Sequence, residues 1–110
     1  MAPQHVLGLV EGNVDTYTTV ERLEATMDRV VKRLGLNEVS RAFHQFEPYG
    51  ATGVIVLAES HFSAHTYPED DRVYVDLFCC SEHFDPDKAA DVISDEFGCD
   101  MFMWEKIKRS

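Results

Sequence analysis

Five segments of the chain have the length and apolar character of β-strands: residues 5–11, 39–46, 52–59, 72–79 and 101–107. In the fourth, Val73, Val75 and Leu77 occupy alternate positions, which predicts a strand with one apolar face. A turn-rich link at residues 47–51 predicts an antiparallel hairpin between the second and third segments. The last segment is expected to be an edge strand.

A first helix is predicted by apolar residues that recur at helical spacing from Val20 to Leu34. Thr18 and Glu21 stand at the two positions of a capping box, which marks the start of this helix. Gly35 is well placed to end it, because glycine adopts the left-handed conformation of a helix C-terminus without strain. One face of this helix is therefore expected to belong to the core.

A second helix is predicted after Asp85, with this residue as N-cap, Pro86 at the first helical position and Gly98 at the end. The order strand, helix, strand, strand, strand, helix, strand predicts an α+β fold. We expect a two-layer sandwich, with a mainly antiparallel sheet and two helices on one face, formed by residues 1–110 as a single domain. The other sheet face needs a cover, so we expect a dimer through that face or through the helix layer.

Composition narrows the class of ligand and partner. The chain has 110 residues and a formal net charge of -10, with 10 basic against 20 acidic residues. This balance argues against nucleic acid and anionic membranes as ligands, because both are bound by clustered Lys and Arg. No apolar run reaches the length of a membrane span, no basic leader precedes one, and three cysteines show no disulfide framework. We therefore expect a cytoplasmic protein with free thiols.

The sequence around Ser60 carries the candidate chemistry. The apolar run at residues 54–58 is followed by Glu59, Ser60 and His61, with His65 five residues after the serine, and then by a polar stretch at 66–71. We expect Ser60 at the exit of a strand, where its hydroxyl can be aimed at the preceding carbonyl.

Several side chains of zinc-binding type follow this point: His61, His65, Cys79, Cys80 and His83. Adjacent cysteines do not have the spacing of a zinc ligand pair, so we predict no metal site. His5, His44 and His83 are expected to be surface or strand-edge residues rather than ligands.

Residues 43–50, 53–61, 65–69, 75–80 and 85–89 together resemble the short prokaryotic pyruvoyl-dependent S-adenosylmethionine decarboxylases. In that family a serine hydroxyl attacks the preceding carbonyl, and elimination leaves a pyruvoyl group. The resemblance implies cleavage between Glu59 and Ser60 into residues 1–59, the beta chain, and 60–110, the alpha chain. It also implies a covalent pyruvoyl cofactor, derived from Ser60, that forms a Schiff base with the substrate amine.

The resemblance also implies roles for other residues. His65 and Thr52 would support processing, with Thr52 in place of the usual serine, and Cys80 would donate a proton to the product. Phe46 would stack on adenine and Glu69 would line the nucleoside pocket. The catalytic set is thus expected to be Ser60, His65 and Cys80.

The chain departs from the family pattern at Cys79, which replaces a usual threonine, and at Tyr67, which replaces a usual tryptophan. The expected activity is decarboxylation of S-adenosylmethionine, a small molecule with a primary amine and a carboxylate, by a homodimer of processed protomers. The product would donate aminopropyl groups for polyamine synthesis. Two alternatives stay open: an arginine or ornithine decarboxylase, to which Asp70 and Asp71 could offer carboxylates, and a non-catalytic regulatory subunit of an active paralogue.

Overall fold

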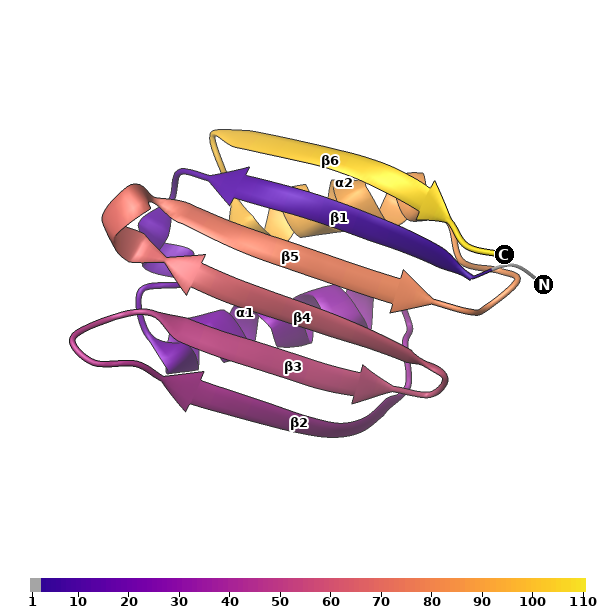
Figure 1. Cartoon of the computed structure of the whole chain (residues 1–110), viewed down its shortest axis with the longest axis horizontal. Helices are drawn as coiled ribbons and strands as arrows, with labels where there is room; N and C mark the ends of the chain where they lie inside the picture. Colours follow the sequence, from indigo (N-terminus) through magenta and orange to yellow (C-terminus); the bar gives the residue numbers. More distant parts are fainter. Residues whose placement is uncertain (1–2) are drawn as a thin grey trace.

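The computed structural model describes residues 3–110, which form one antiparallel sheet with two helices on one of its faces (Figure 1). The spatial order of the strands is β2-β3-β4-β5-β1-β6, and all neighbouring strands are antiparallel. The predicted α+β architecture is confirmed. The elements are β1 (Gln4–Glu11), α1 (Val20–Arg33), β2 (Glu38–Gln45), β3 (Ala51–Leu57), β4 (Ser60–Tyr67), β5 (Arg72–Cys79), α2 (Pro86–Phe97) and β6 (Met101–Lys108), with short 3-10 turns at Val14–Thr16 and Pro68–Asp70.

The ends of both helices follow from local chemistry. The N-cap of α1 is Thr19, whose side chain accepts a hydrogen bond from the Arg22 amide, so the cap lies one residue later than the capping box predicts. Thr18 instead donates its hydroxyl to the carbonyl of Val14 at 2.6 Å. The predicted cap of α2 is confirmed, because the Asp85 carboxylate accepts from two backbone amides in the first turn.

One strand, β4, is missing from the elements predicted by the sequence. Residues 60–67 alternate between buried Phe62, Ala64 and Thr66 and outward-facing polar side chains. Their burial alternates as in any half-buried strand. Two histidines and two serines lower the apolar content of this segment, so its sequence does not stand out as a strand. The predicted strand 52–59 accordingly ends at Leu57, and Ser60 begins β4 instead of following the end of a strand.

The core lies between the sheet and the helices. Leu23, Met27 and Val30 of α1 and Ile93 and Phe97 of α2 are fully buried against it. Burying an aliphatic or aromatic side chain of this size stabilises a fold by about 1.5–3 kcal/mol. The packing of the two helices therefore accounts for a large part of the fold's stability and holds the sheet as a rigid platform.

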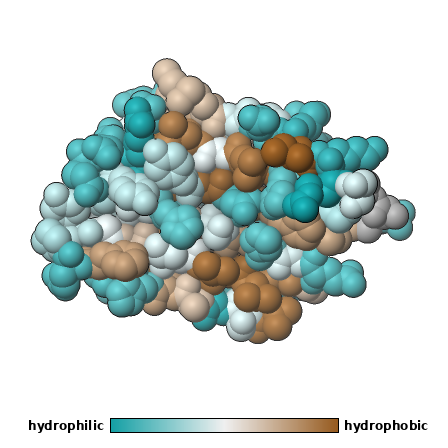
Figure 2. All heavy atoms as spheres, in the orientation of Figure 1, coloured by the Kyte–Doolittle hydropathy of each residue, from teal (hydrophilic) through white to brown (hydrophobic). Residues whose placement is uncertain are grey.

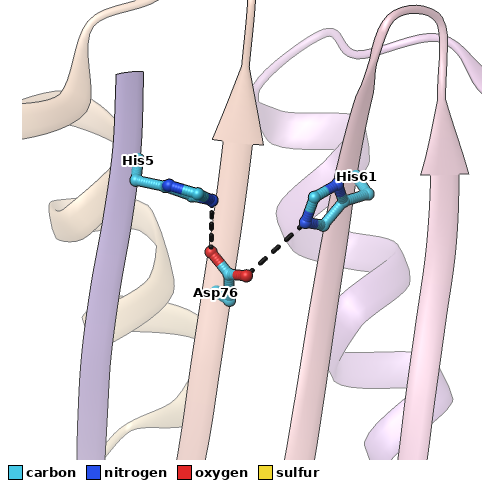
Figure 3. Close-up of side chains that lie close together, drawn as sticks. All are labelled: His5, His61 and Asp76. Atoms are coloured by element: carbon cyan, nitrogen blue, oxygen red, sulfur yellow. Dashed lines mark ion pairs between the residues drawn. The ribbon is translucent and has the colours of Figure 1, made fainter. Parts of the chain in front are cut away.

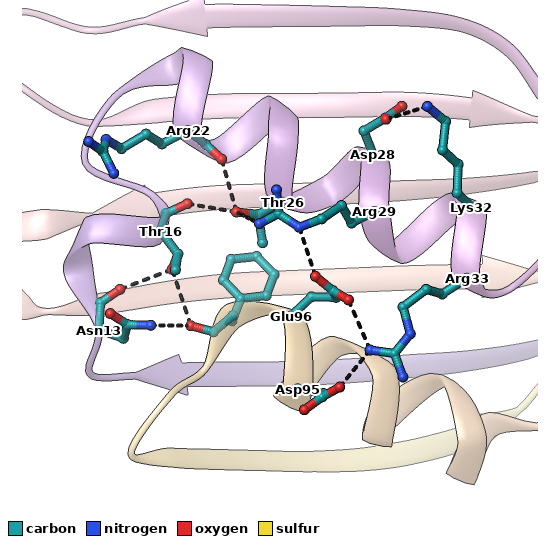
Figure 4. Close-up of polar contacts among 11 residues, drawn as sticks. Asn13, Thr16, Arg22, Thr26, Asp28, Arg29, Lys32, Arg33, Asp95 and Glu96 are labelled. Carbon is teal, nitrogen blue, oxygen red and sulfur yellow. Dashed lines mark hydrogen bonds and ion pairs between the residues drawn. The ribbon is translucent and has the colours of Figure 1, made fainter.

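Ion pairs join the two helices on their solvent side (Figure 4). Glu96 of α2 accepts hydrogen bonds from Arg29 and Arg33 of α1 at 2.8 and 2.9 Å, and Asp95 also contacts Arg33 at 2.6 Å. The hydrogen bonds from Arg29 and Arg33 hold the pKa of Glu96 below its ordinary value. Charge thus reinforces the contact between α1 and α2.

The sheet face opposite the helices, here called the outer face, is not covered by any other element of residues 3–110 (Figure 1). Figure 2 looks onto this face, where apolar and polar side chains are interspersed. Its exposed apolar side chains are Leu7, Val56, Tyr67, Tyr74, Met101 and Met103. Within residues 3–110, no helix is long and apolar enough to cross a membrane.

Candidate active site

Ser60 follows a two-residue turn between paired strands. Leu57 and Ser60 are partners in the β3–β4 ladder, so Ala58 and Glu59 form the connection. Glu59 has a left-handed backbone with φ of 61°, which costs a residue with a side chain roughly 1–2 kcal/mol. The peptide bond that the sequence marks for cleavage therefore lies beside a conformation that the surrounding hairpin imposes.

The backbone of Cys80 lies beside Ser60. It directly follows β5, and its backbone N–H donates to the Ser60 hydroxyl oxygen at 3.4 Å. Its side chain is half-buried, whereas Cys79 is 2% exposed and packs in the core. Strand alternation thus separates the two adjacent cysteines and leaves Cys80 as the one available for chemistry.

Thr52 and His65 form a second group on the outer face. They are register partners in β3 and β4, and the Thr52 hydroxyl oxygen lies 3.0 Å from Nδ1 of His65. Because a hydroxyl can donate or accept, it can fix the ring orientation of either imidazole tautomer. The contact with Thr52 therefore orients the His65 imidazole.

A hollow of about 470 Å³ adjoins this pair. Phe46, Tyr67 and Glu69 line it, together with Thr52 and His65. The Phe46 and Tyr67 side chains are exposed, which leaves aromatic surface available to a planar ligand. The expected nucleoside-binding residues are thus brought together, on the same side as the expected processing group.

The structure does not bring Ser60 and His65 together within one chain. Ser60 is the first residue of β4 and His65 the sixth, and five strand steps correspond to about 16 Å. The Ser60–Cys80 group and the Thr52–His65 group therefore lie toward opposite ends of the strand. The expected site residues form two half-sites.

A third polar group, His5, His61 and Asp76, lies on the outer face and has no counterpart in the sequence interpretation. His5 is not a strand-edge residue, since β1 lies between β5 and β6 and the His5 side chain is only 15% exposed. Its Nε2 atom is 3.1 Å from Asp76, and that of His61 is 3.5 Å from the same carboxylate (Figure 3). Only the strand order reveals this group, because 71 positions separate the first residue from the last.

Residues 4–110 match a family model described as S-adenosylmethionine decarboxylase. The chain belongs to this family. An S-adenosylmethionine decarboxylase proenzyme from Carboxydothermus hydrogenoformans is 36% identical over 107 residues, which cover 96% of this chain and 84% of that protein. A proenzyme of the same name from Aquifex aeolicus is 41% identical over 86 residues, or 77% of this chain and 62% of that protein.

The fold agrees with membership of the S-adenosylmethionine decarboxylase family. The crystal structure of the adenosylmethionine decarboxylase from Aquifex aeolicus superposes with a TM-score of 0.89 at 30% identity and covers 99% of this chain and 91% of that chain. The predicted family resemblance is thereby confirmed. The matches do not favour the alternatives of an arginine or ornithine decarboxylase or a regulatory subunit.

Proposed function

We propose that this chain is a self-cleaving proenzyme that yields a decarboxylase of S-adenosylmethionine. The observation that carries the proposal is the pairing of family membership with the local geometry at Ser60. Ser60 directly follows Glu59, whose backbone is left-handed, and the Ser60 hydroxyl oxygen accepts a hydrogen bond from the backbone amide of Cys80. The product of decarboxylation would donate aminopropyl groups for polyamine synthesis.

The chain itself supplies both groups that react in the cleavage step, the Ser60 hydroxyl and the Glu59 carbonyl. The Ser60 hydroxyl oxygen attacks the Glu59 carbonyl carbon, the amide nitrogen leaves, and an ester joins the two residues. Loss of the Ser60 α-proton then breaks the bond from Cβ to oxygen and releases residues 1–59 with a carboxylate at Glu59. Addition of water to the remaining dehydroalanine releases ammonia and leaves a pyruvoyl group at the head of residues 60–110.

The residues around Ser60 fit this prosthetic group. A left-handed Glu59 places the scissile bond in a tight turn, and the Cys80 N–H is directed at the nucleophilic oxygen. The pyruvoyl carbonyl would supply an electron sink for the substrate's α-amino carbon as carbon dioxide leaves. The Cys80 backbone lies beside that position, and its half-buried thiol would deliver a proton to the product.

His65 reaches Ser60 only if a second protomer contributes it. The two half-sites lie toward opposite ends of β4, and a two-fold axis perpendicular to the strands would reverse the strand direction of one protomer relative to the other. Packing two outer faces across such an axis would bring the β3–β4 turn and Cys80 of one protomer toward Thr52 and His65 of the partner subunit. The exposed apolar side chains of the outer face, among them Leu7, Tyr74 and Met103, suit such an interface.

In this arrangement the hollow beside Phe46 and Glu69 would receive the nucleoside of the substrate. Adenine would stack on Phe46, while the amino acid end would extend to position 60 of the neighbouring protomer. Both sites of the dimer would then be composite.

The direct test is release of labelled carbon dioxide from carboxyl-labelled S-adenosylmethionine, with labelled arginine and ornithine in parallel. The proposal expects release from S-adenosylmethionine alone, by wild type and not by Ser60→Ala. Release from arginine or ornithine but not from S-adenosylmethionine would overturn the substrate. No release from any of the three by a cleaved protein would overturn the decarboxylase function.

A further inference from the structure

His5, His61 and Asp76, here called the histidine–aspartate cluster, come from three neighbouring strands of the outer face. His5 lies on β1, Asp76 on β5 and His61 on β4, and both imidazoles direct Nε2 at the same carboxylate (Figure 3). Neither histidine touches the hollow beside Phe46. The cluster therefore lies outside the hollow beside Phe46, although His61 directly follows Ser60 in the chain and Asp76 shares a shallow hollow with His65.

The distances in the cluster suit a small cation. One ligand atom from each residue can be chosen so that all three lie within 4.8 Å of one another, and two of the contacts measure 3.1 and 3.5 Å. Ligands about 2.0–2.2 Å from a tetrahedral Zn²⁺ are spaced roughly 3.3–3.6 Å apart. The two contacts run to different oxygens of the Asp76 carboxylate, so the His5–Asp76 pair already approaches the required separation and a rotation of the half-exposed His61 ring would bring in the third ligand.

The contact between His5 and Asp76 is not a satisfied hydrogen bond. His5 Nε2 and the nearer Asp76 oxygen are shielded from solvent and lack a hydrogen-bond partner, although they are 3.1 Å apart. A buried polar atom without a partner destabilises the fold, because it has lost its hydrogen bonds to water and gained none in return. A cation between them would satisfy both lone pairs at once.

We propose that the histidine–aspartate cluster binds one divalent transition metal ion of the Zn²⁺, Ni²⁺ or Co²⁺ class. Two imidazoles and one carboxylate favour these ions over Mg²⁺ and Ca²⁺, which take oxygen ligands. Three protein ligands leave a fourth position for water or for a group from a molecule packed on the outer face. This metal site differs from the expectation from sequence, which is that the chain has no metal site.

This site has a consequence that rests on the proposed cleavage. His5 would belong to the 1–59 fragment, whereas His61 and Asp76 would belong to the 60–110 fragment. A metal ion in the cluster would therefore join the two fragments, with one ligand a single residue from the new N-terminus. Metal binding itself does not require cleavage, because all three ligands are already placed in the uncut chain.

The test uses tag-free Ser60→Ala protein, stripped with a chelator and titrated with Co²⁺, whose visible absorption reports tetrahedral nitrogen and oxygen ligation. Zn²⁺ content after gel filtration gives the stoichiometry. His61→Ala and Asp76→Asn each remove one ligand in this background, and His83→Ala removes an exposed histidine outside the cluster. Circular dichroism checks that each variant is folded.

We expect about one Co²⁺ or Zn²⁺ per chain, a higher melting temperature with Zn²⁺, and loss of both in His61→Ala and Asp76→Asn but not in His83→Ala. Absence of bound metal in the folded parent protein would overturn the site. Equal metal content in the parent and in either folded ligand variant would overturn it as well. Because Ser60→Ala cannot be cleaved, these outcomes are independent of whether the wild-type chain processes itself.

Discussion

Thr52 and His65 face each other across β3 and β4, with 3.0 Å between the hydroxyl oxygen and Nδ1 of the ring. The hydroxyl restrains the rotation of an exposed imidazole, so that Nε2 is presented in a constant direction. Threonine supports this contact through the same oxygen that a serine would use, and its methyl group further limits the side-chain rotamer. The contact accordingly supports the expected role of His65 in processing.

Thr52→Val should slow cleavage between Glu59 and Ser60, because it removes the hydroxyl but keeps the shape of the side chain. A hydrogen bond worth about 1 kcal/mol corresponds to a change of about fivefold in rate. Thr52→Ser is the matched control and should cleave about as fast as wild type. The measurement is the fraction of uncut chain against time by gel electrophoresis, and equal rates for Thr52→Val and wild type would refute the role of the hydroxyl.

Mixing two inactive chains tests the composite site. Neither Ser60→Ala nor His65→Ala should be cut alone, but their mixed dimer holds one site with both Ser60 and the partner's His65 intact. Co-expression should therefore restore cleavage of the His65→Ala chain, while the Ser60→Ala chain stays whole. An uncut His65→Ala chain in purified mixed dimers would show that the two half-sites do not meet across this interface.

The two adjacent cysteines should differ in what they affect. Cys80→Ala should lower decarboxylation by about 100-fold, the lower range for loss of a positioned proton donor, with little effect on melting temperature. Cys79→Ser should instead lower the free energy of unfolding by about 1–3 kcal/mol, because it places a hydroxyl in the core. Activity per cleaved chain and thermal unfolding separate the two effects, and a loss of catalysis confined to Cys79→Ser would reverse the assignment.

The ion pairs of Glu96 should make stability depend on pH. Arg29 and Arg33 lower the pKa of Glu96 in the folded protein, so its stabilising effect is present above its ordinary value of 4.5 and is lost as the pH falls through the folded pKa. Glu96→Gln should therefore destabilise the protein by about 1 kcal/mol near neutral pH, since both arginines are partly exposed and screened. Urea unfolding should show this difference shrinking at strongly acidic pH. A difference independent of pH would mean that charge is not its origin.

Local patterns predict most of the fold. The caps at Asp85 and Gly98 and the apolar faces of both helices depend on neighbours within a few residues, and the sequence states these directly. The strand β4 was not predicted, because its apolar residues Phe62 and Ala64 alternate with polar side chains that resemble a loop. The strand conformation of β4 is decided by its hydrogen-bonded pairing with β3 on one side and with β5 on the other.

The candidate site could be predicted residue by residue but not as an arrangement. The family resemblance implies roles for Cys80, His65 and Thr52, yet only the length of β4 shows that Ser60 and His65 lie toward opposite ends of it. The histidine–aspartate cluster is still less visible, because His5 and Asp76 meet through the pairing of β1 with β5. Such contacts depend on strand order, which alternation alone does not determine.

Intact-protein mass spectrometry of wild type beside Ser60→Ala tests the self-cleavage most directly. We expect wild type to give two polypeptides, residues 1–59 and residues 60–110, the second lighter by one ammonia than a fragment that begins with an unmodified serine. Ser60→Ala should give one uncut chain. A single uncut chain in wild-type dimers as well would contradict the proposal, since no pyruvoyl group could then form at position 60.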